Sequence, residues 1–340
     1  MFVIADDLTG AAEIAGIANN NSDNDVTVIA TDTRSLTAND AKAETLRIIE
    51  KHSLTNNDRI FKKTDSALRG HIVLELEILM HTTGFKKCLL LPQNPSKGRT
   101  IKDGEYYINN TPLHETDFRF DPEFPAITSD VRRILKGCHY LTLNGELQEG
   151  INIAEAASAE DIRKQIGKID KHTLCAGAAD LFTEAFSLGQ QPIFLQIENK
   201  FSKLLIVQGS TQSKDLSATT FFKSHNVQIC PMPDDVFDGN DRTDWIKSGN
   251  ICLTIPQKRN NPVWCKTIMA RTVKAALEES QRNGDSILLI IEGGATAFAV
   301  LNELGWAEFE VAGQLAPGVV AFNHHNNRII LKPGSYPWEG

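Results

Sequence analysis

Short apolar runs alternate with amphipathic stretches along most of this 340-residue chain, and this alternation limits the folds that it can adopt. Buried parallel strands read as nearly continuous apolar runs, and consecutive parallel strands need a crossover that is usually a helix. The pattern therefore predicts an α/β fold with mainly parallel sheets flanked by helices. In the first part of the chain we expect strands at 2–5, 26–30, 60–63, 88–91, 140–143 and 173–176, and helices at 11–18, 38–52, 72–82, 129–136 and 159–168.

The length of the chain suits two domains, at roughly 150 residues per domain. The alternation pauses over residues 189–203 and restarts with a strand expected at 203–207. We therefore expect one domain over residues 1–200 and a second over 201–340. A polar segment at 92–129 is long for a loop, and we expect a hairpin inside it around Asn109-Asn110. Loops longer than about 12–15 residues are usually functional or partly structured.

Charge and composition exclude several classes of function. The net charge of −8 argues against a nucleic-acid or anionic-membrane partner, because such partners favour a basic face. The six cysteines are scattered without a C-x-x-C pair, which predicts free thiols in a reducing cytoplasm. The nine histidines lack zinc spacing, and no apolar run approaches the roughly 20 residues of a membrane helix. We also expect no secretory leader, since acidic residues arrive at position 6.

Two adjacent carboxylates end the first expected strand. Asp6 and Asp7 follow the apolar run 2–5 and precede Thr9-Gly10 and the first expected helix. Open α/β sheets bind ligands beyond the carboxyl ends of their strands, so these carboxylates are candidates for catalysis or for substrate binding. Adjacent carboxylates repel each other, so at least one of them needs a cation or a proton. The alternative is that one Asp caps the helix and the other is solvated.

A second cluster of polar residues follows the strand expected at 60–63. Lysine, hydroxyl, aspartate and arginine side chains lie within the stretch 62–70, and Arg34 follows the strand expected at 26–30. Such residues can offer charged and neutral donors to a carboxylate. The alternative for the stretch 62–70 is an exposed charged turn.

Small residues follow two apolar runs of the C-terminal half. The run 204–208 leads into Gly209 and Ser210, and the run 287–292 leads into Gly293-Gly294-Ala295-Thr296. Small residues at a helix N-terminus leave backbone N–H groups free to bind phosphate. Neither loop has the spacing of a Walker A or a dinucleotide fingerprint. Together they predict a nucleotide-binding domain of another type.

Nine short motifs follow one another along the chain, namely Ile4–Gly10, Thr31–Arg34, Lys62–Gly70, Gly98–Thr100, Pro112–Thr116, Gly209-Ser210, Gly293–Thr296, Pro317-Gly318 and Lys332–Gly334. In this order they resemble the motifs of the four-carbon acid-sugar kinase family over nearly the whole chain. The resemblance implies an ATP-dependent kinase of threonate, erythronate or a related acid. It implies an N-terminal domain that binds the sugar acid and a C-terminal domain that binds ATP.

The resemblance and the residue chemistry together assign roles. We expect Asp7 or Asp6, at the end of the first expected strand, to orient or deprotonate the reacting hydroxyl. We expect Arg34 and Lys63 to hold the substrate carboxylate, in a cleft between the domains. The expected acid-binding residues are Asp6, Asp7, Arg34, Lys63, Thr64, Asp65, Ser66 and Arg69, with Asp7 and Asp6 catalytic. The expected ATP-binding residues are Ser210, Gly293, Gly294, Ala295, Thr296 and Gly334. Mg²⁺ is expected with ATP, but its protein ligands are not identified.

The chain departs from the family pattern in ways that keep alternatives open. Ala295 stands where the family usually has Asp, Ala67 replaces a usual Thr, and His71 replaces a usual Asn. The closing motif also differs after Gly334. One alternative is therefore a non-catalytic sugar-acid sensor. A dinucleotide-dependent oxidoreductase is disfavoured because G-x-G-x-x-G is absent. The sequence leaves a homo-oligomer open.

Overall fold

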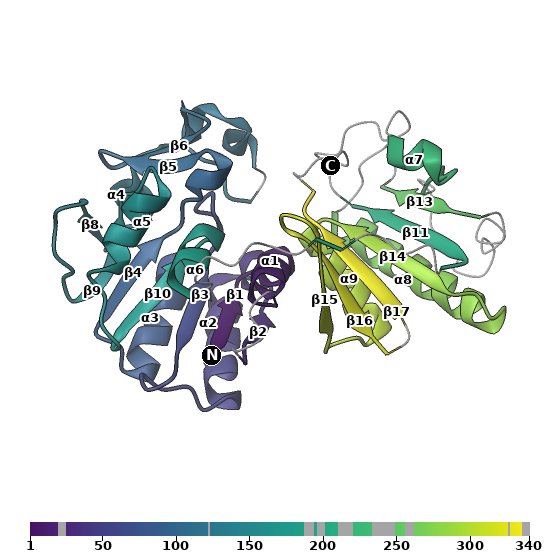
Figure 1. Cartoon of the computed structure of the whole chain (residues 1–340), viewed down its shortest axis with the longest axis horizontal. Helices are drawn as coiled ribbons and strands as arrows, with labels where there is room; N and C mark the ends of the chain where they lie inside the picture. The colour runs from purple at the N-terminus through teal and green to yellow at the C-terminus, as the bar shows by residue number, and fades with distance from the viewer. Residues whose placement is uncertain are drawn as a thin grey trace. The chain divides into compact units, whose positions relative to one another are not determined.

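The structure is a computed structural model that describes residues 1–19, 25–121, 123–186, 194–195, 201–209, 220–232, 249–255, 262–325 and 327–334. The chain divides into two compact units, Met1–Gln191 and Pro192–Gly340 (Figure 1). Each unit contains a seven-stranded sheet with flanking helices. The predicted α/β fold with mainly parallel sheets is therefore confirmed.

The sheet of the first unit is parallel throughout, with strand order β2-β1-β3-β10-β4-β9-β8. Its strands are β1 (Phe2–Ala5), β2 (Thr27–Ala30), β3 (Ile60–Lys63), β4 (Lys87–Leu91), β8 (His139–Leu141), β9 (Gly150–Ala154) and β10 (Thr173–Gly177). Alternate side chains of the strands enter two separate cores. Ile4 packs with residues such as Ile48 and Leu76, whereas Val3 packs with residues such as Ile14.

Helices cover both faces of this sheet, as a fully parallel sheet requires. Helix α2 (Ala38–Lys51) and helix α3 (Ile72–Thr83) contribute to one core, and helix α1 (Leu8–Ala18), helix α5 (Ala159–Ile166) and helix α6 (Ala179–Phe186) contribute to the other.

The strand order reverses direction at β1. The chain passes from β1 to β2 on one side and then returns to β3 on the other side of β1. Ala5 pairs in register with Lys63, so the loops after both strands start at the same level of the sheet. Ligands of open α/β sheets bind at such a reversal, outside the carboxyl ends of the strands. The topology therefore points to the loops that begin at Asp6 and Thr64.

The polar segment after β4 forms a small antiparallel sheet, which we call the cap (residues 95–121). Its strands are β5 (Arg99–Lys102), β6 (Glu105–Ile108) and β7 (Thr111–Pro112), and short 3₁₀ turns lie at Pro95–Lys97, Leu113–Glu115 and Asp117–Phe120. The expected hairpin around Asn109-Asn110 is present, and both residues have positive φ. Strand β5 was not expected, because its sequence Arg-Thr-Ile-Lys has only one apolar residue.

The sheet of the second unit has strand order β12-β13-β11-β14-β17-β16-β15. Its first five strands are parallel, and β15 to β17 form an antiparallel meander. The strands are β11 (Lys203–Gln208), β12 (Gln228–Pro231), β13 (Ile251–Thr254), β14 (Ile287–Glu292), β15 (Glu310–Ala316), β16 (Val319–His324) and β17 (Asn327–Lys332). The helices are α7 (Thr220–Ser224), α8 (Pro262–Arg282) and α9 (Gly294–Leu304).

Several element bounds differ from expectation for local reasons. Helix α1 begins at Leu8 rather than at residue 11, because the Asp7 side chain accepts a hydrogen bond from the backbone N–H of Gly10 and caps the helix. Helix α4 (Val131–Ile134) is shorter than the predicted 129–136, because Asp130 caps its start and the backbone leaves the helical conformation at Leu135. In the described part of the chain, no helix is long and apolar enough to cross a membrane.

Candidate functional site

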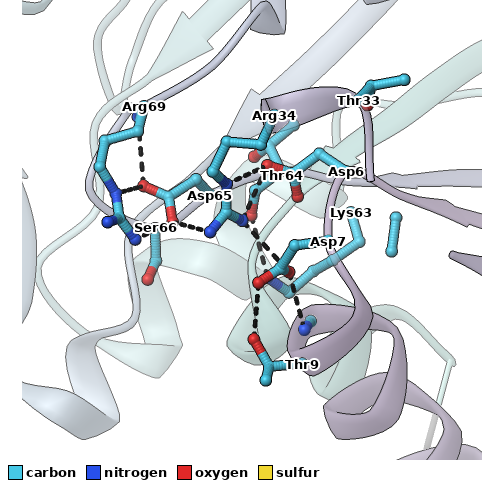
Figure 2. Close-up of polar contacts among 12 residues, drawn as sticks. Asp6, Asp7, Thr9, Thr33, Arg34, Lys63, Thr64, Asp65, Ser66 and Arg69 are labelled. Carbon is cyan, nitrogen blue, oxygen red and sulfur yellow. Dashed lines mark hydrogen bonds and ion pairs between the residues drawn. The ribbon is translucent and has the colours of Figure 1, made fainter. Parts of the chain in front are cut away.

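The loops at the carboxyl ends of β1, β2 and β3 bring three carboxylates onto one guanidinium (Figure 2). Nε and Nη2 of Arg34 lie 2.9 Å and 2.8 Å from Oδ2 of Asp6. Nη2 is also 3.1 Å from Oδ1 of Asp7, and Nη1 is 3.3 Å from Oδ1 of Asp65. The Arg34 side chain is only 15% exposed, so these ion pairs are shielded from water. The sequence predicted the members of this cluster but not that they bind one another.

The backbone around Arg34 explains its position. Asp32 adopts a left-handed conformation, and a single 3₁₀ turn at Thr33–Ser35 follows it. The backbone N–H of Arg34 donates to the carbonyl of Asp6 at 3.2 Å, which ties the turn after β2 to the end of β1. The guanidinium is thereby held over the carboxylates that follow β1.

The pKa values of Asp6 and Asp7 shift in opposite directions. Burial raises the pKa of Asp6 above its ordinary value, against the attraction of Arg34. Burial also opposes ionisation of Asp7, but Arg34, Lys63 and a hydrogen bond from the Thr9 hydroxyl outweigh it and lower the pKa of Asp7. Asp7 is therefore the carboxylate of the pair with the lower pKa, and it can accept a hydrogen bond.

Asp65 is the most strongly held carboxylate of the cluster. The guanidinium of Arg69 donates to both of its oxygens, at 2.9 Å and 3.0 Å, and the backbone N–H groups of Ala67 and Arg69 donate to Oδ2. Burial opposes ionisation, yet Arg34 and Arg69 hold the pKa of Asp65 well below its usual range. Arg69 also donates to Asp121 of the cap at 3.1 Å. Asp65 therefore fixes the loop after β3 rather than acting as a proton acceptor.

Two buried polar atoms at this edge lack a partner in the described part of the protein. They are Oδ1 of Asp6 and Oγ1 of Thr64, and both residues are at least nine-tenths buried. Lys63 lies beside them, with Nζ donating to the carbonyl of Thr64 at 2.9 Å and lying 3.9 Å from Glu13. Buried polar atoms normally have hydrogen-bond partners, so the unsatisfied pair is consistent with a polar ligand at this edge.

The loop after β4 contributes residues that the sequence analysis did not assign. The backbone N–H and hydroxyl of Ser96 donate to Asp180 at the start of α6, and Lys97 forms an ion pair with Glu13 of α1. Arg99 of the cap donates to the hydroxyl of Ser66. The motif Gly98–Thr100, which the sequence analysis gave no role, was the sequence signal that could have pointed to the residues after β4.

The second unit places its small residues at the start of α9. Gly293 has φ +98° and precedes this helix of 11 residues, and its backbone N–H donates to the carbonyl of Lys332 at 3.0 Å. A Cβ on Gly209 would lie 1.8 Å from Oγ1 of Thr296, so only glycine fits there. Nε2 of Gln208, beside this glycine, is buried and has no hydrogen-bond partner within the described residues.

Not every predicted ATP-binding residue can be placed. Gly294, Ala295 and Thr296 form the first turn of α9, and Gly334 follows β17. The carbonyl contact between Lys332 and Gly293 brings the end of β17 beside the start of α9. Ser210 lies outside the described residues. Within the described ranges, no group of three or more His, Cys, Asp or Glu side chains could hold a metal ion.

Residues 1–185 match the family model of the sugar-binding N-terminal domain, which is more than half of the chain. The chain belongs to the four-carbon acid-sugar kinase family. The match covers the unit that contains the Arg34 cluster. The resemblance inferred from the motifs is therefore confirmed.

Curated relatives agree with this membership. The chain is 30% identical to a D-threonate kinase of Salmonella typhimurium over 151 residues, which are 40% of this chain and 36% of the relative. It is 30% identical to a 3-oxo-tetronate kinase of Brucella melitensis over 154 residues, 39% and 35% of the two chains. A 3-oxo-tetronate kinase of Pseudomonas fluorescens is 26% identical over 210 residues, 55% and 48%. The chain thus matches about a third to a half of the length of these relatives.

Solved structures share the whole fold. A Salmonella typhimurium LT2 protein named as a tRNA synthase superposes with a TM-score of 0.75 at 19% identity, over 99% of this chain and 96% of that one. A Haemophilus influenzae protein of family DUF1537 gives 0.69 at 17% identity, over 99% and 97%. At these identities the likeness concerns the fold alone.

Proposed function

We propose that this protein is an ATP-dependent kinase that phosphorylates a hydroxyl group of a small sugar acid, with four carbons as the expected length. The observation that carries the proposal is the carboxylate cluster at the β1/β3 reversal, in a chain of this family. Relatives named as D-threonate and 3-oxo-tetronate kinases support the substrate class.

In this proposal Asp7 receives the hydrogen bond of the reacting hydroxyl. Its carboxylate is ionised, it stands at the start of α1, and its side chain is more exposed than that of Asp6. A correctly placed carboxylate can orient the hydroxyl and take its proton as the phosphoryl group is transferred. Asp6 lies deeper and supports the cluster through Arg34.

We further propose that Lys63, Thr64, Asp65, Ser66 and Arg69 line the acid-binding site. The unsatisfied oxygen of Thr64 suits a substrate hydroxyl, and Ser66 offers a second hydroxyl at the same loop. Asp65 and Arg69 keep this loop in its shape through their mutual ion pair. The earlier expectation that Arg34 holds a substrate carboxylate stays untested, and the three protein carboxylates on Arg34 weigh against it.

ATP is proposed to bind to the second unit at the start of α9. A positive-φ glycine precedes this 11-residue helix, and a second glycine packs against Thr296. Glycines at a helix N-terminus let a phosphate group approach the free backbone N–H groups closely. The unsatisfied amide of Gln208 offers one more donor at this edge. That the two sites face each other in a cleft stays a prediction.

The described residues do not form a protein cage for Mg²⁺. Mg²⁺ commonly keeps several water ligands and is held largely by the phosphates of its nucleotide. We therefore propose that it arrives as magnesium–ATP, and we assign no step to a protein-bound metal.

An ADP-release assay against four-carbon sugar acids tests this proposal. With magnesium–ATP present, at least one of D-threonate, D-erythronate and 3-oxo-tetronate should raise ADP release well above the rate with ATP alone. Binding of magnesium–ATP should also raise the melting temperature, because a ligand at 100 times its Kd stabilises a protein by about 2.7 kcal/mol. A stabilised protein that releases no ADP with any acid would contradict the kinase assignment.

The two glycines that flank α9 provide a matched test of the ATP site. Gly293 and Gly305 have φ of +98° and +70°, so alanine at either position is strained and should lower stability. The loss should be larger at Gly293, because its ψ of 129° lies outside the left-handed helical region that Gly305 adopts. Only Gly293→Ala should also weaken ATP binding, since its methyl group would stand where phosphate approaches the backbone. Isothermal calorimetry with magnesium–ATP measures both variants. Equal ATP affinity in the two variants would show that the nucleotide does not bind at the start of α9.

A further inference from the structure

Among the residues that the structure describes, five cationic side chains lie at the carboxyl edge of the first sheet, and their partners differ. Arg34 contacts three carboxylates, Arg69 contacts two, and Lys63 and Lys97 both lie by Glu13. Arg99 is the exception. Among the described residues no carboxylate contacts its guanidinium, whose hydrogen-bond partner is the neutral hydroxyl of Ser66.

The position of Arg99 is well defined despite this lack of a counter-charge. Its guanidinium carbon lies 5.7 Å from the ring centroid of Phe118, and that of Arg69 lies 5.3 Å from the same centroid. Arg99 begins β5, and its backbone N–H donates to the carbonyl of Asn94 at 3.0 Å. Arg99 is partly buried, so its positive charge is neither fully hydrated nor neutralised by the protein.

A second cap residue holds the same loop. The hydroxyl of Tyr106, which is fully buried in the cap, donates to the backbone carbonyl of Ser66. Ser66 follows Asp65 directly, and Figure 2 shows Ser66 beside Asp65 and Arg69 in the loop after β3. The cap therefore places an unneutralised guanidinium at the loop that we propose to bind the acid.

We infer that Arg99, together with the hydroxyl of Ser66, forms the subsite for the carboxylate of the sugar acid, and that Arg34 instead organises the three protein carboxylates. This inference rests on the proposed function and makes it more specific. A planar guanidinium can bind a carboxylate through two parallel hydrogen bonds, and a partly buried cation without a counter-charge gains most from one. A further carboxylate at Arg34 would add a fourth negative charge to a cluster that already has three.

The test compares a sugar acid with its uncharged amide. D-threonate and D-threonamide are titrated by calorimetry into wild type, Arg99→Met and Arg99→Lys, without nucleotide, and KM and kcat are measured with magnesium–ATP. We expect Arg99→Met to weaken threonate binding roughly 10- to 100-fold and to leave threonamide binding unchanged. Arg99→Lys should recover part of the loss because it keeps the charge without the planar fork.

Two matched controls separate charge recognition from loop positioning. Arg119→Met removes another cap arginine, which is exposed and lies over Phe120. This variant should bind both threonate and threonamide with wild-type affinity. Tyr106→Phe removes the other hydrogen bond to Ser66 and should affect acid and amide alike. If Arg99→Met weakens both ligands equally, as Tyr106→Phe does, Arg99 only positions the loop and the inference is wrong.

The outcomes also separate this inference from the proposed function. Unchanged threonate binding by Arg99→Met, in a protein that phosphorylates threonate, would overturn the carboxylate subsite and leave the kinase standing. Arg99-dependent threonate binding without phosphoryl transfer would leave the subsite standing and overturn the kinase. A wild-type protein that binds none of D-threonate, D-erythronate and 3-oxo-tetronate would overturn both.

Discussion

Asp7→Asn should lower kcat by about 10²- to 10⁴-fold while leaving ATP affinity near that of the wild type, as expected for loss of a general base. Asparagine caps helices about as well as aspartate, so helix α1 should persist. The substitution removes the negative charge that we propose to orient the reacting hydroxyl. Steady-state kinetics with saturating acid and ATP measures the effect. Asp6→Asn should have a smaller effect, because Asp6 lies deeper and acts through Arg34.

Thr37→Ala is the control for this prediction. Thr37 caps helix α2 through the backbone N–H of Asp40, and its loss should cost about 0.5–2 kcal/mol of stability without changing kcat. Wild-type turnover in both Asp7→Asn and Asp6→Asn would show that neither carboxylate after β1 is catalytic.

Lys62→Met should destabilise the protein by about 3–5 kcal/mol, the largest stability effect that we expect from one substitution. Nζ of Lys62 lies 2.5 Å from Oε2 of Glu75 on α3, and both side chains are 2% exposed. Removing the lysine leaves the Glu75 carboxylate buried without its cation. Urea unfolding followed by circular dichroism measures the loss.

The double variant Lys62→Met/Glu75→Leu is the matched control. Replacing a buried ion pair by apolar residues of similar volume is often neutral, so the double variant should recover most of the stability lost in Lys62→Met. A double variant as unstable as the single one would show that packing around Lys62, not the uncompensated charge, causes the loss.

Local sequence patterns predicted six of the seven parallel strands of the first sheet, but they missed β9 (Gly150–Ala154). The runs that became β1 and β3 have apolar or buried side chains at every position. Asp7 caps the helix that follows β1, which was one part of the alternative interpretation of the two carboxylates. The other role foreseen for the pair, charge compensation, also exists, since Arg34 contacts both Asp6 and Asp7. The capping part of the alternative is therefore confirmed, but its other part is wrong, because Asp6 is buried and bound to Arg34 rather than solvated.

The cap and the pairing within the site could not be predicted from local patterns. Strand β5 is mostly polar, and it forms because Ile101 and Tyr106 are buried by the rest of the unit. The contact between Arg99 and Ser66 joins residues 33 positions apart, and the contact between Arg34 and Asp65 depends on the strand order. The spacing of residues along the chain does not predict contacts between residues that are far apart in sequence.

The most direct test of the central claim is phosphoryl transfer itself. The protein is incubated with γ-³²P-labelled magnesium–ATP and the four-carbon acid that it binds best. The products are then separated, and their masses are measured by mass spectrometry. We predict a labelled phosphate ester of the acid, formed in step with ADP and strongly reduced in Asp7→Asn. Label found only in ATP and inorganic phosphate, with the acid unchanged, would contradict the assignment of this chain as a sugar-acid kinase.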